Sequence, residues 1–223
     1  MKGKISEIFE SIQGEGIYAG EKQIFVRFFG CNLNCGFCDT RPYHFVEYNP
    51  KELFSHIKRY RGTYHSIAFT GGEPLMQKNF LMEVMRLTRK SGFKNYLETN
   101  GTLPQALEEV IDYSDIVAMD LKLPSSTNQG SYWDEHRRFL NVAAGKETFL
   151  KMVICNTTQE QDLRRGISLV KESNPSTVLV LQPNSYERID SLSEKLEQFR
   201  NICIGENITV CVIPQIHRII GAK

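Results

Sequence analysis

One stretch of the sequence decides the fold: Gln23-Ile24-Phe25-Val26-Arg27-Phe28-Phe29-Gly30-Cys31-Asn32-Leu33-Asn34-Cys35-Gly36-Phe37-Cys38-Asp39-Thr40. Residues 23–29 are mostly apolar, which is typical of a β-strand that is buried on both faces. The residues after this strand hold three cysteines within eight positions. In parallel α/β folds the active site lies at the ends of the strands, so metal-binding residue types at this point indicate a functional loop.

Six further apolar runs continue the pattern along the chain, at Ser66–Thr70, Lys94–Thr99, Asp115–Asp120, Thr148–Ile154, Thr177–Leu181 and Asn207–Ile213. Amphipathic stretches lie between them. Two examples are Ser191–Arg200 and Thr158–Ser173, where Thr158 and Gln161 have the spacing of a capping box. Alternating strands and helices predict parallel strands joined by crossover helices.

Chain length indicates how far such a sheet closes. A complete eight-unit barrel takes about 250 residues and some take about 200, whereas this chain has 223. We therefore expect an α/β fold, a partial (βα)6-type barrel with parallel strands. An N-terminal extension precedes the first barrel strand, and no internal linker or repeat divides residues 1–223, which predicts a single domain.

Composition and charge exclude several classes of function. Lys plus Arg number 27 and Asp plus Glu 26, so the net charge is +1, without the basic footprint of a nucleic-acid or membrane-surface binder. No apolar run approaches membrane-spanning length, and residues 1–4 lead into the chain without a signal-peptide core. We expect a cytoplasmic protein with a small-molecule partner, in which thiols stay reduced and clustered cysteines hold metal.

Five other predicted strands also end in polar, glycine-rich or metal-capable residues. These are Thr70-Gly71-Gly72-Glu73-Pro74, Glu98-Thr99-Asn100-Gly101, Asp120-Leu121-Lys122, Gln182-Pro183-Asn184-Ser185 and Pro214-Gln215-Ile216-His217. Because the carboxyl ends of parallel strands meet on one face, we expect these motifs to form one pocket.

The three-cysteine loop has more than one chemical interpretation. Structural zinc takes four ligands, and here Asp39 or His44 would have to supply the fourth. A four-iron cluster held by Cys31, Cys35 and Cys38 has one iron open to a substrate or cofactor. The remaining cysteines, Cys155, Cys203 and Cys211, lie in or beside predicted strands, where cysteine behaves as a small hydrophobic residue.

Cys31-x3-Cys35-x2-Cys38 after the first strand, with Gly71-Gly72-Glu73-Pro74 after the second, resembles the radical S-adenosylmethionine (SAM) superfamily. The resemblance implies that the cysteines hold a [4Fe-4S] cluster whose open iron binds SAM, that Phe37 lies near adenine and that the glycine-rich motif contacts the methionine amino group. Glycine suits this role because it lets a backbone approach a ligand closely. Taken alone, the glycine motif is also typical of a plain strand-to-helix turn.

The likeness is closest to the 7-carboxy-7-deazaguanine synthase family of queuosine and 7-deazapurine biosynthesis. It runs along essentially the whole chain, through Phe9-x3-Gln13-Gly14-Glu15-Gly16, Phe25-Val26-Arg27-x3-Cys31, Cys38-Asp39-Thr40, Thr70-Gly71-Gly72-Glu73-Pro74, Leu97-Glu98-Thr99-Asn100-Gly101, Leu181-Gln182-Pro183 and Gln215-x-His217-Arg218. The N-terminal motif by itself also fits a β-hairpin with its turn near residues 14–20.

The resemblance implies a lyase that contracts 6-carboxy-5,6,7,8-tetrahydropterin to 7-carboxy-7-deazaguanine with loss of ammonia. It also implies catalytic use of SAM, a requirement for Mg²⁺, a flavodoxin- or ferredoxin-type reductant and a homodimer. Thr40 falls at the family's magnesium ligand, although a threonine in this loop has no such meaning by itself. Mg²⁺ prefers oxygen ligands and keeps several waters.

The resemblance assigns two further sets of residues. Candidate substrate contacts are Ile12, Gln13, Gly14, Glu15, Arg27, Thr70, His217 and Lys223. Candidate cofactor contacts are Phe37, Cys38, Asp39, Gly72, Asp120, Leu121, Lys122, Gln182, Pro183, Asn184 and Ser185. Arg27 makes chemical sense because a guanidinium binds a carboxylate through two parallel hydrogen bonds, although an arginine on a strand is more often a surface residue.

One motif departs from the family pattern. The family often has Ser-Pro-Lys after the fourth strand, where this chain has Asp120-Leu121-Lys122. An Asp-x-Lys also occurs there in activases of glycyl radical enzymes, which leaves an activase as an alternative. A non-enzymatic, zinc-stabilised binding module is the third hypothesis.

Overall fold

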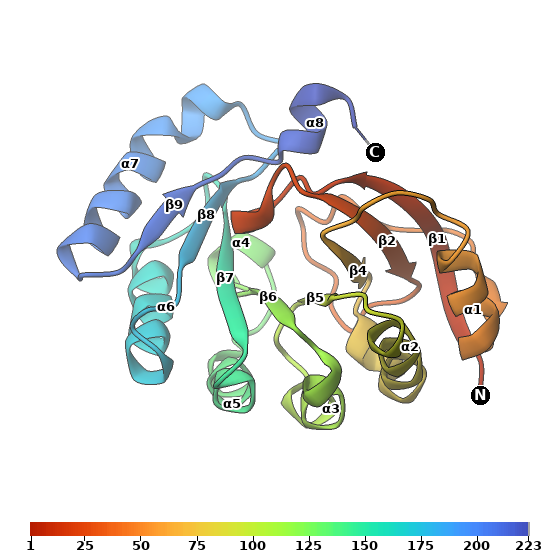
Figure 1. The fold of residues 1–223 in the computed structure, drawn as a ribbon. Helices are drawn as coiled ribbons and strands as arrows, with labels where there is room; N and C mark the ends of the chain where they lie inside the picture. The colour runs from red at the N-terminus through yellow and green to blue at the C-terminus, as the bar shows by residue number, and fades with distance from the viewer. Residues whose placement is uncertain (223) are drawn as a thin grey trace.

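The computed structural model describes residues 1–222, in which one mixed sheet forms an open arc (Figure 1). Its strands are β1 (Gly3–Ile12), β2 (Lys22–Phe28), β3 (Val46–Tyr48), β4 (Ser66–Gly71), β5 (Asn95–Thr99), β6 (Ile116–Asp120), β7 (Glu147–Ile154), β8 (Leu179–Pro183) and β9 (Val210–Val212). Its helices are α1 (Pro50–Ile57), α2 (Lys78–Lys90), α3 (Pro104–Val110), α4 (Pro124–Thr127), α5 (Trp133–Ala143), α6 (Glu160–Ser173), α7 (Ile189–Gly205) and α8 (Ile216–Ile220).

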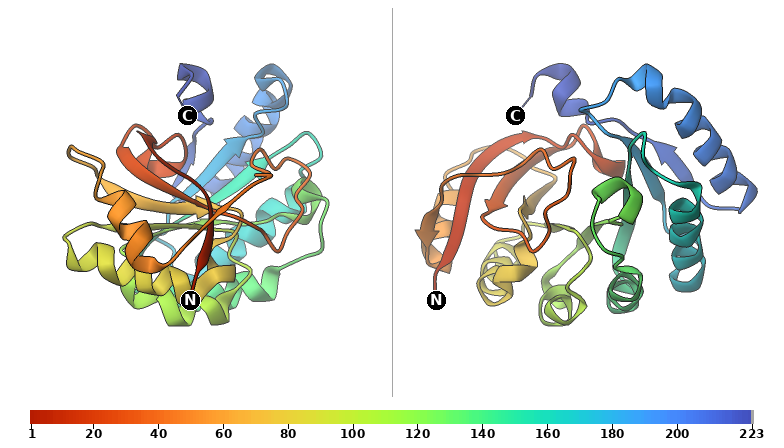
Figure 2. Two further views of the ribbon diagram at one scale, coloured as in Figure 1. Left: turned by 90° about the vertical axis from the view of Figure 1, so that its right-hand side faces the viewer. Right: turned by 180° about the vertical axis from the view of Figure 1, so that it is seen from behind.

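The strand order is β3-β1-β2-β4-β5-β6-β7-β8-β9. From β2 to β9 every neighbouring pair is parallel, and helices α1, α2, α3, α5, α6 and α7 connect the successive strands. Figure 2 shows the same arc from behind, with these helices on its outer side. The expected partial (βα)6-type barrel is confirmed: six strand–helix units and a seventh parallel strand form a sheet that does not close.

Side chains on each strand point alternately toward the helices and toward the inner face of the sheet, which separates a core from a pocket. On β2, Ile24, Val26 and Phe28 belong to the large core between sheet and helices, whereas Phe25 belongs to a smaller cluster on the inner face. Arg27 shares that inner face because neighbouring side chains on a strand point in opposite directions. Helix α2 completes the outer layer, with Leu81, Val84 and Met85 buried. Burying each such side chain stabilises the fold by about 1.5–3 kcal/mol.

The N-terminal extension is part of the sheet. Strand β1 pairs antiparallel with β2, and the connection between them contains a short 3₁₀ helix, Gly16–Tyr18. The amide of Gln13 donates to the Glu21 carbonyl (2.8 Å), and that of Gly20 to the Gln13 carbonyl (2.8 Å). The hairpin interpretation of this segment is therefore confirmed, and the turn lies beside the inner face.

Three sequence predictions about element ends are wrong. The strand predicted at Thr177–Leu181 is β8, Leu179–Pro183, because Gln182 and Pro183 still pair with β7. Helix α6 begins at Glu160 and its N-cap is Gln159, without a side-chain hydrogen bond. The Thr158 hydroxyl instead accepts from the Cys155 amide (2.7 Å) because this threonine lies in the turn before the helix. The last strand is also shorter than residues 207–213, since Asn207 adopts a left-handed conformation (φ 59°) that a strand excludes.

All six cysteines are free thiols. Cys155 and Cys203 are buried as predicted, and Cys211 on the edge strand β9 is only half-buried. Among the helices of residues 1–222, none is both long and apolar enough to cross a membrane.

Candidate active site

A cavity of about 240 Å³ opens at the carboxyl ends of the parallel strands. Its walls come from the β1–β2 turn, the cysteine loop, the ends of β2 and β4 to β8, and the start of α8. Residues far apart in the chain thus meet at one place, as the strand-end motifs predict.

Most residues predicted from the sequence lie around this cavity. The candidate substrate contacts that line it are Ile12, Gln13, Gly14, Glu15, Arg27, Thr70 and His217. The candidate metal and cofactor contacts that line it are Cys31, Cys35, Phe37, Cys38, Asp39, Thr40, Gly72, Asp120, Lys122, Gln182, Asn184 and Ser185. Leu121 packs into the core and Pro183 does not line the cavity. Lys223 lies outside the described residues.

The cysteine loop is held by contacts with its own backbone and with α4. The Gly36 amide donates to the Thr127 carbonyl (3.1 Å), and the Cys38 amide to the Cys35 carbonyl (3.2 Å). The Arg41 guanidinium donates to the same Cys35 carbonyl (3.0 Å). Burial raises the pKa of the Cys31 and Cys35 thiols. Metal binding would therefore release protons from this loop.

The donor set of the cysteine loop fits an iron–sulfur cluster. Within residues 1–222, no three His, Cys, Asp or Glu side chains are arranged to hold a single metal ion. A four-iron cluster is several atoms across, so its thiolates stand further apart than the ligands of one ion. Three reduced cysteines that line one cavity fit such a cluster with one iron left open.

The glycine-rich turn after β4 passes directly against the start of the cysteine loop. Gly71 has a φ of +114°, and a Cβ on Gly72 would lie 1.8 Å from the Gly30 carbonyl oxygen. The Gly72 amide donates to the Phe28 carbonyl (3.0 Å), and the Glu73 amide to the Gly30 carbonyl (2.8 Å). The glycines are therefore needed to bring the two backbones together, whatever ligand they contact.

Glu73, the acid of this motif, is buried beneath the turn and does not line the cavity. It accepts from the Thr99 hydroxyl (2.9 Å), the Asn100 amide (2.8 Å) and the Leu75 amide (3.0 Å). Burial outweighs these donors and raises its pKa to about 7. Glu73 thus joins the ends of β4 and β5 beneath the site.

One wall of the cavity carries a row of uncharged and acidic hydrogen-bonding groups. The Gln13 side chain donates to Glu98 (2.8 Å) and to Gln23 (3.0 Å), and the Thr70 hydroxyl donates to Glu98. Burial raises the pKa of Glu98. The wall therefore presents amide, hydroxyl and carboxyl groups side by side, next to aromatic rings of Phe9 and Phe25 that stack at 5.1 Å.

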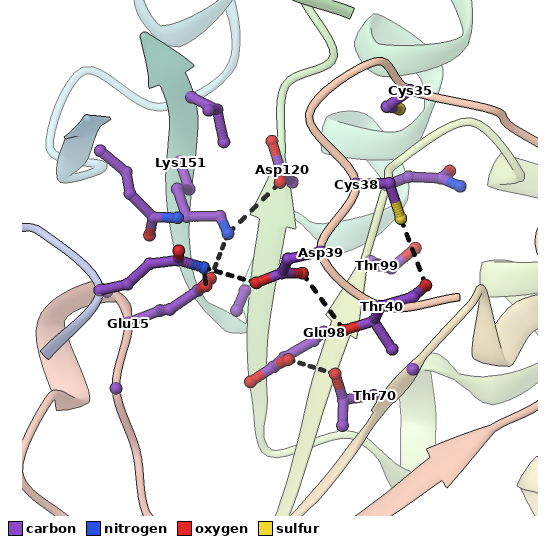
Figure 3. Close-up of a pocket in the computed structure, with 18 of the residues that line it drawn as sticks. Glu15, Cys35, Cys38, Asp39, Thr40, Thr70, Glu98, Thr99, Asp120 and Lys151 are labelled. Carbon is purple, nitrogen blue, oxygen red and sulfur yellow. Dashed lines mark hydrogen bonds and ion pairs between the residues drawn. The ribbon is translucent and has the colours of Figure 1, made fainter. Parts of the chain in front are cut away.

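A second wall carries paired charges. Lys151 on β7 lies between Glu15 and Asp120, with 3.4 Å to Asp120 (Figure 3). Lys122 lies 2.7 Å from the same Asp120. Burial alone would raise the pKa of Glu15, but Lys151 and Gln215 outweigh it and lower that pKa. Burial is outweighed in the same way at the other two groups. Lys122 and Lys151 lower the pKa of Asp120. Glu15 and Asp120 raise the pKa of Lys151. All three groups are charged at neutral pH.

Arg27 connects the hydrogen-bonding wall to the cysteine loop. Its Nε is 3.1 Å from a carboxylate oxygen of Glu7, and its Nη1 donates to the Thr40 hydroxyl (3.1 Å). That hydroxyl in turn donates to Asp39 (3.2 Å). Thr40 and Asp39 thus offer two oxygen atoms beside a guanidinium, and a magnesium ion there would need further oxygens from substrate and water.

The C-terminal helix α8 covers the opening of the cavity. The Ile216 amide donates to the Gly14 carbonyl (2.9 Å), and Gln215 donates to Glu15 (2.5 Å) and Asp39 (3.0 Å). A Cβ on Gly14 would lie 1.8 Å from Nδ1 of His217, so a larger residue here would displace the His217 side chain. Figure 1 shows α8 beside that turn.

Sequence reasoning missed Lys151 and did not select Glu98 as a contact. Lys151 stands in the middle of an otherwise apolar strand, between Phe149 and Val153, which line the same cavity. A lone lysine in a buried strand needs a partner, and that is the signal that would have identified it.

The fold and the three-cysteine loop define a radical SAM protein, and the Radical SAM superfamily model matches residues 25–196. A 7-carboxy-7-deazaguanine synthase of Geobacter sulfurreducens is 32% identical over 98% of this chain and 97% of its own length. One of Methanothermobacter thermautotrophicus is 34% identical over 100% and 99%. The chain belongs to the 7-carboxy-7-deazaguanine synthase family.

Solved structures support the fold. The crystal structure of QueE from Escherichia coli superposes with a TM-score of 0.69 at 23% identity, covering 95% of this chain and 94% of that one. SuiB of Streptococcus suis, bound to its precursor peptide SuiA, gives a TM-score of 0.61 at 16% identity over 82% of this chain and 46% of that chain. The full-length sequence relatives favour the synthase over the activase and the zinc module considered from the sequence.

Proposed function

We propose that residues 1–223 form one radical SAM domain that contracts 6-carboxy-5,6,7,8-tetrahydropterin to 7-carboxy-7-deazaguanine with release of ammonia. One observation carries the proposal: the seven described candidate substrate residues and the three cysteines line a single cavity. The full-length relatives that bear the name of this synthase support the same reaction.

The cofactor end of the cavity suits the [4Fe-4S] cluster and SAM. Cys31, Cys35 and Cys38 would hold the cluster, and Phe37, over whose ring Lys122 lies at 5.3 Å, would lie near adenine. Gly72, Asp120 and the 182–185 segment line the same end, apart from Pro183. When bound, the reduced cluster and SAM supply the adenosyl radical that removes hydrogen from C6 of the pterin.

The substrate end suits a flat, hydrogen-bonding heterocycle with a carboxylate. Gln13, Thr70 and Glu98 alternate donors and acceptors that match the edge of a pterin ring. Phe9 and Phe25 provide an apolar surface for its face. Arg27 would bind the carboxylate, and the Thr40 hydroxyl beside it would be a ligand of Mg²⁺ together with that carboxylate.

Glu15 and Lys151 would keep their charges throughout the reaction. Each neutralises the other inside a buried wall, which places an acceptor and a cation at defined positions without net charge. Gln215, the N-cap of α8, and His217 on α8 would cover the bound pterin and exclude water, since both line the cavity. A cytoplasmic location, expected from the sequence, completes the proposal. A flavodoxin- or ferredoxin-type electron donor and a homodimer are part of it as well, and these two rest on the family resemblance.

The test is anaerobic turnover of the reconstituted enzyme with SAM, dithionite, Mg²⁺ and the carboxylated pterin. Replacing Arg27 by Gln removes a charge-assisted pair worth about 1.5–3 kcal/mol, so we expect the KM for the pterin to rise about 10- to 100-fold. Arg164→Gln, which changes an exposed arginine paired with Glu160, is the matched control and leaves KM unchanged.

Two outcomes would contradict the proposal. One is an unchanged KM in the Arg27→Gln variant. The other is cleavage of SAM by the wild-type enzyme without consumption of the pterin, accompanied by activation of a glycyl radical partner.

A further inference from the structure

Asn100, in the loop after β5, lies between the glycine-rich turn and the cysteine loop. Its backbone amide donates to Glu73 (2.8 Å), and its carbonyl faces Nε2 of His136 on α5 at 3.2 Å. His136 is fully buried, and burial lowers its pKa to about 4, so the ring is neutral and Nε2–H donates to the carbonyl. The backbone of Asn100 is thus held on both sides.

The orientation of the Asn100 side chain follows from its partners. One of its amide atoms lies 3.0 Å from the backbone N–H of Thr102 and 2.6 Å from the Thr102 hydroxyl. A backbone N–H can only donate, so this amide atom is the oxygen. The amide nitrogen Nδ2 therefore faces the cysteine loop.

On that side Nδ2 has two acceptors. It donates to Oδ1 of Asn32 (2.9 Å) and reaches Sγ of Cys31 at 3.8 Å. Asn32 itself donates to the Thr102 hydroxyl (2.8 Å), which closes a ring of hydrogen bonds around the amide. Sγ of Cys31 also accepts from the Leu33 amide (3.4 Å). For the described residues, Cys31 is the one cysteine of the loop whose sulfur accepts N–H donors.

We propose that Asn100 is a positioning residue of the iron–sulfur centre, which donates an N–H to the Cys31 thiolate and raises the reduction potential of the cluster. The reduced cluster carries one more negative charge than the oxidised one. A donor on a ligating sulfur stabilises that charge, and such hydrogen bonds are a recognised determinant of cluster potential. The inference rests on the proposed function only in that the three cysteines hold a cluster.

The experiment measures the midpoint potential of the reconstituted cluster by electron paramagnetic resonance, without substrate, in the full-length protein. Asn100→Leu keeps the side-chain volume and removes the donor, and Asn100→Asp keeps the shape and replaces the donor by an acceptor. We expect reduction to become about tenfold less favourable in Asn100→Leu, a fall of about 59 mV for one electron, and a larger fall in Asn100→Asp. Iron content per chain should match the wild type.

Thr102→Val is the matched control, because it removes a hydroxyl from the same ring of hydrogen bonds but no donor to sulfur. Its midpoint potential should equal that of the wild type. Equal potentials in the wild type and both Asn100 variants would overturn the proposal, as would an equal fall in Thr102→Val. Asn100 variants that fold but take up no iron would also overturn it, since Asn100 would then serve cluster assembly. Failure of pterin turnover with these shifts intact would contradict the proposed function alone.

Discussion

At the scale of single residues, Glu73 has the protonation behaviour with the clearest consequence for stability. Its pKa in the folded protein is raised to about 7 by burial, against an ordinary value of 4.5. The folded state therefore holds this proton more tightly than the unfolded chain. The contribution of Glu73 to the free energy of unfolding is fully present below pH 4.5. About 3 kcal/mol of that free energy is lost as the pH rises to about 7.

Glu73→Gln removes this titration, so we expect the free energy of unfolding of the wild type to fall by about 3 kcal/mol relative to the variant over that pH range. Urea unfolding of the reduced, cluster-free protein at several pH values measures it. Profiles of the two proteins that run parallel across the range would show that Glu73 titrates normally.

The place of a residue in the cavity could be predicted from the sequence where the residue belongs to a recognisable motif. The three cysteines, Gln13 and Arg27 all line the cavity, as the sequence indicates. Lys151 could be recognised as a lone lysine in a buried strand, but its partner could not, because Glu15 is distant in sequence and is brought near by the β1–β2 turn. The orientation of Asn100 likewise depends on Thr102 and on a histidine from another element.

At the scale of elements, the glycine-rich turn after β4 packs directly against the cysteine loop. This contact explains the two glycines, which the sequence alone also allows as a plain strand-to-helix turn. A methyl group on Gly72 would meet a backbone carbonyl, which cannot turn aside as a flexible side chain can. We therefore expect Gly72→Ala to lower the free energy of unfolding by about 1–3 kcal/mol, the usual range for overpacking.

Gly130→Ala is the matched control for this change, since no atom lies within 4 Å of its added Cβ and its φ is not positive. Urea unfolding of the cluster-free protein compares the two variants. Equal stability of Gly72→Ala and Gly130→Ala would refute the close approach of the two backbones.

Apolar runs predicted the parallel strands well because buried strands need continuous hydrophobic sequence. Strand β1 was harder to predict, since its exposed and half-buried positions give it a mixed pattern, as in Glu7 and Glu10. The predicted capping box at Thr158 is wrong for a different reason. The threonine hydroxyl accepts a hydrogen bond from the Cys155 amide in the turn before α6. Spacing in sequence does not distinguish this turn from a helix N-cap.

At the scale of the whole molecule, the seven parallel strands of the open sheet place the cavity-lining residues at their carboxyl ends. The large hydrophobic core lies between the sheet and the helices. The N-terminal hairpin and the C-terminal helix then close the cavity from two sides. Strand β1, the β1–β2 turn and helix α8 lie outside the span of the superfamily match, residues 25–196.

The central claim is that this cavity contracts a carboxylated pterin, and mass spectrometry of the anaerobic reaction mixture tests it most directly. We predict a product lighter than the pterin by one molecule of ammonia, formed by the wild-type enzyme and absent with Cys35→Ala, which removes a proposed cluster ligand. A mixture in which SAM is cleaved while the pterin keeps its mass would contradict the account.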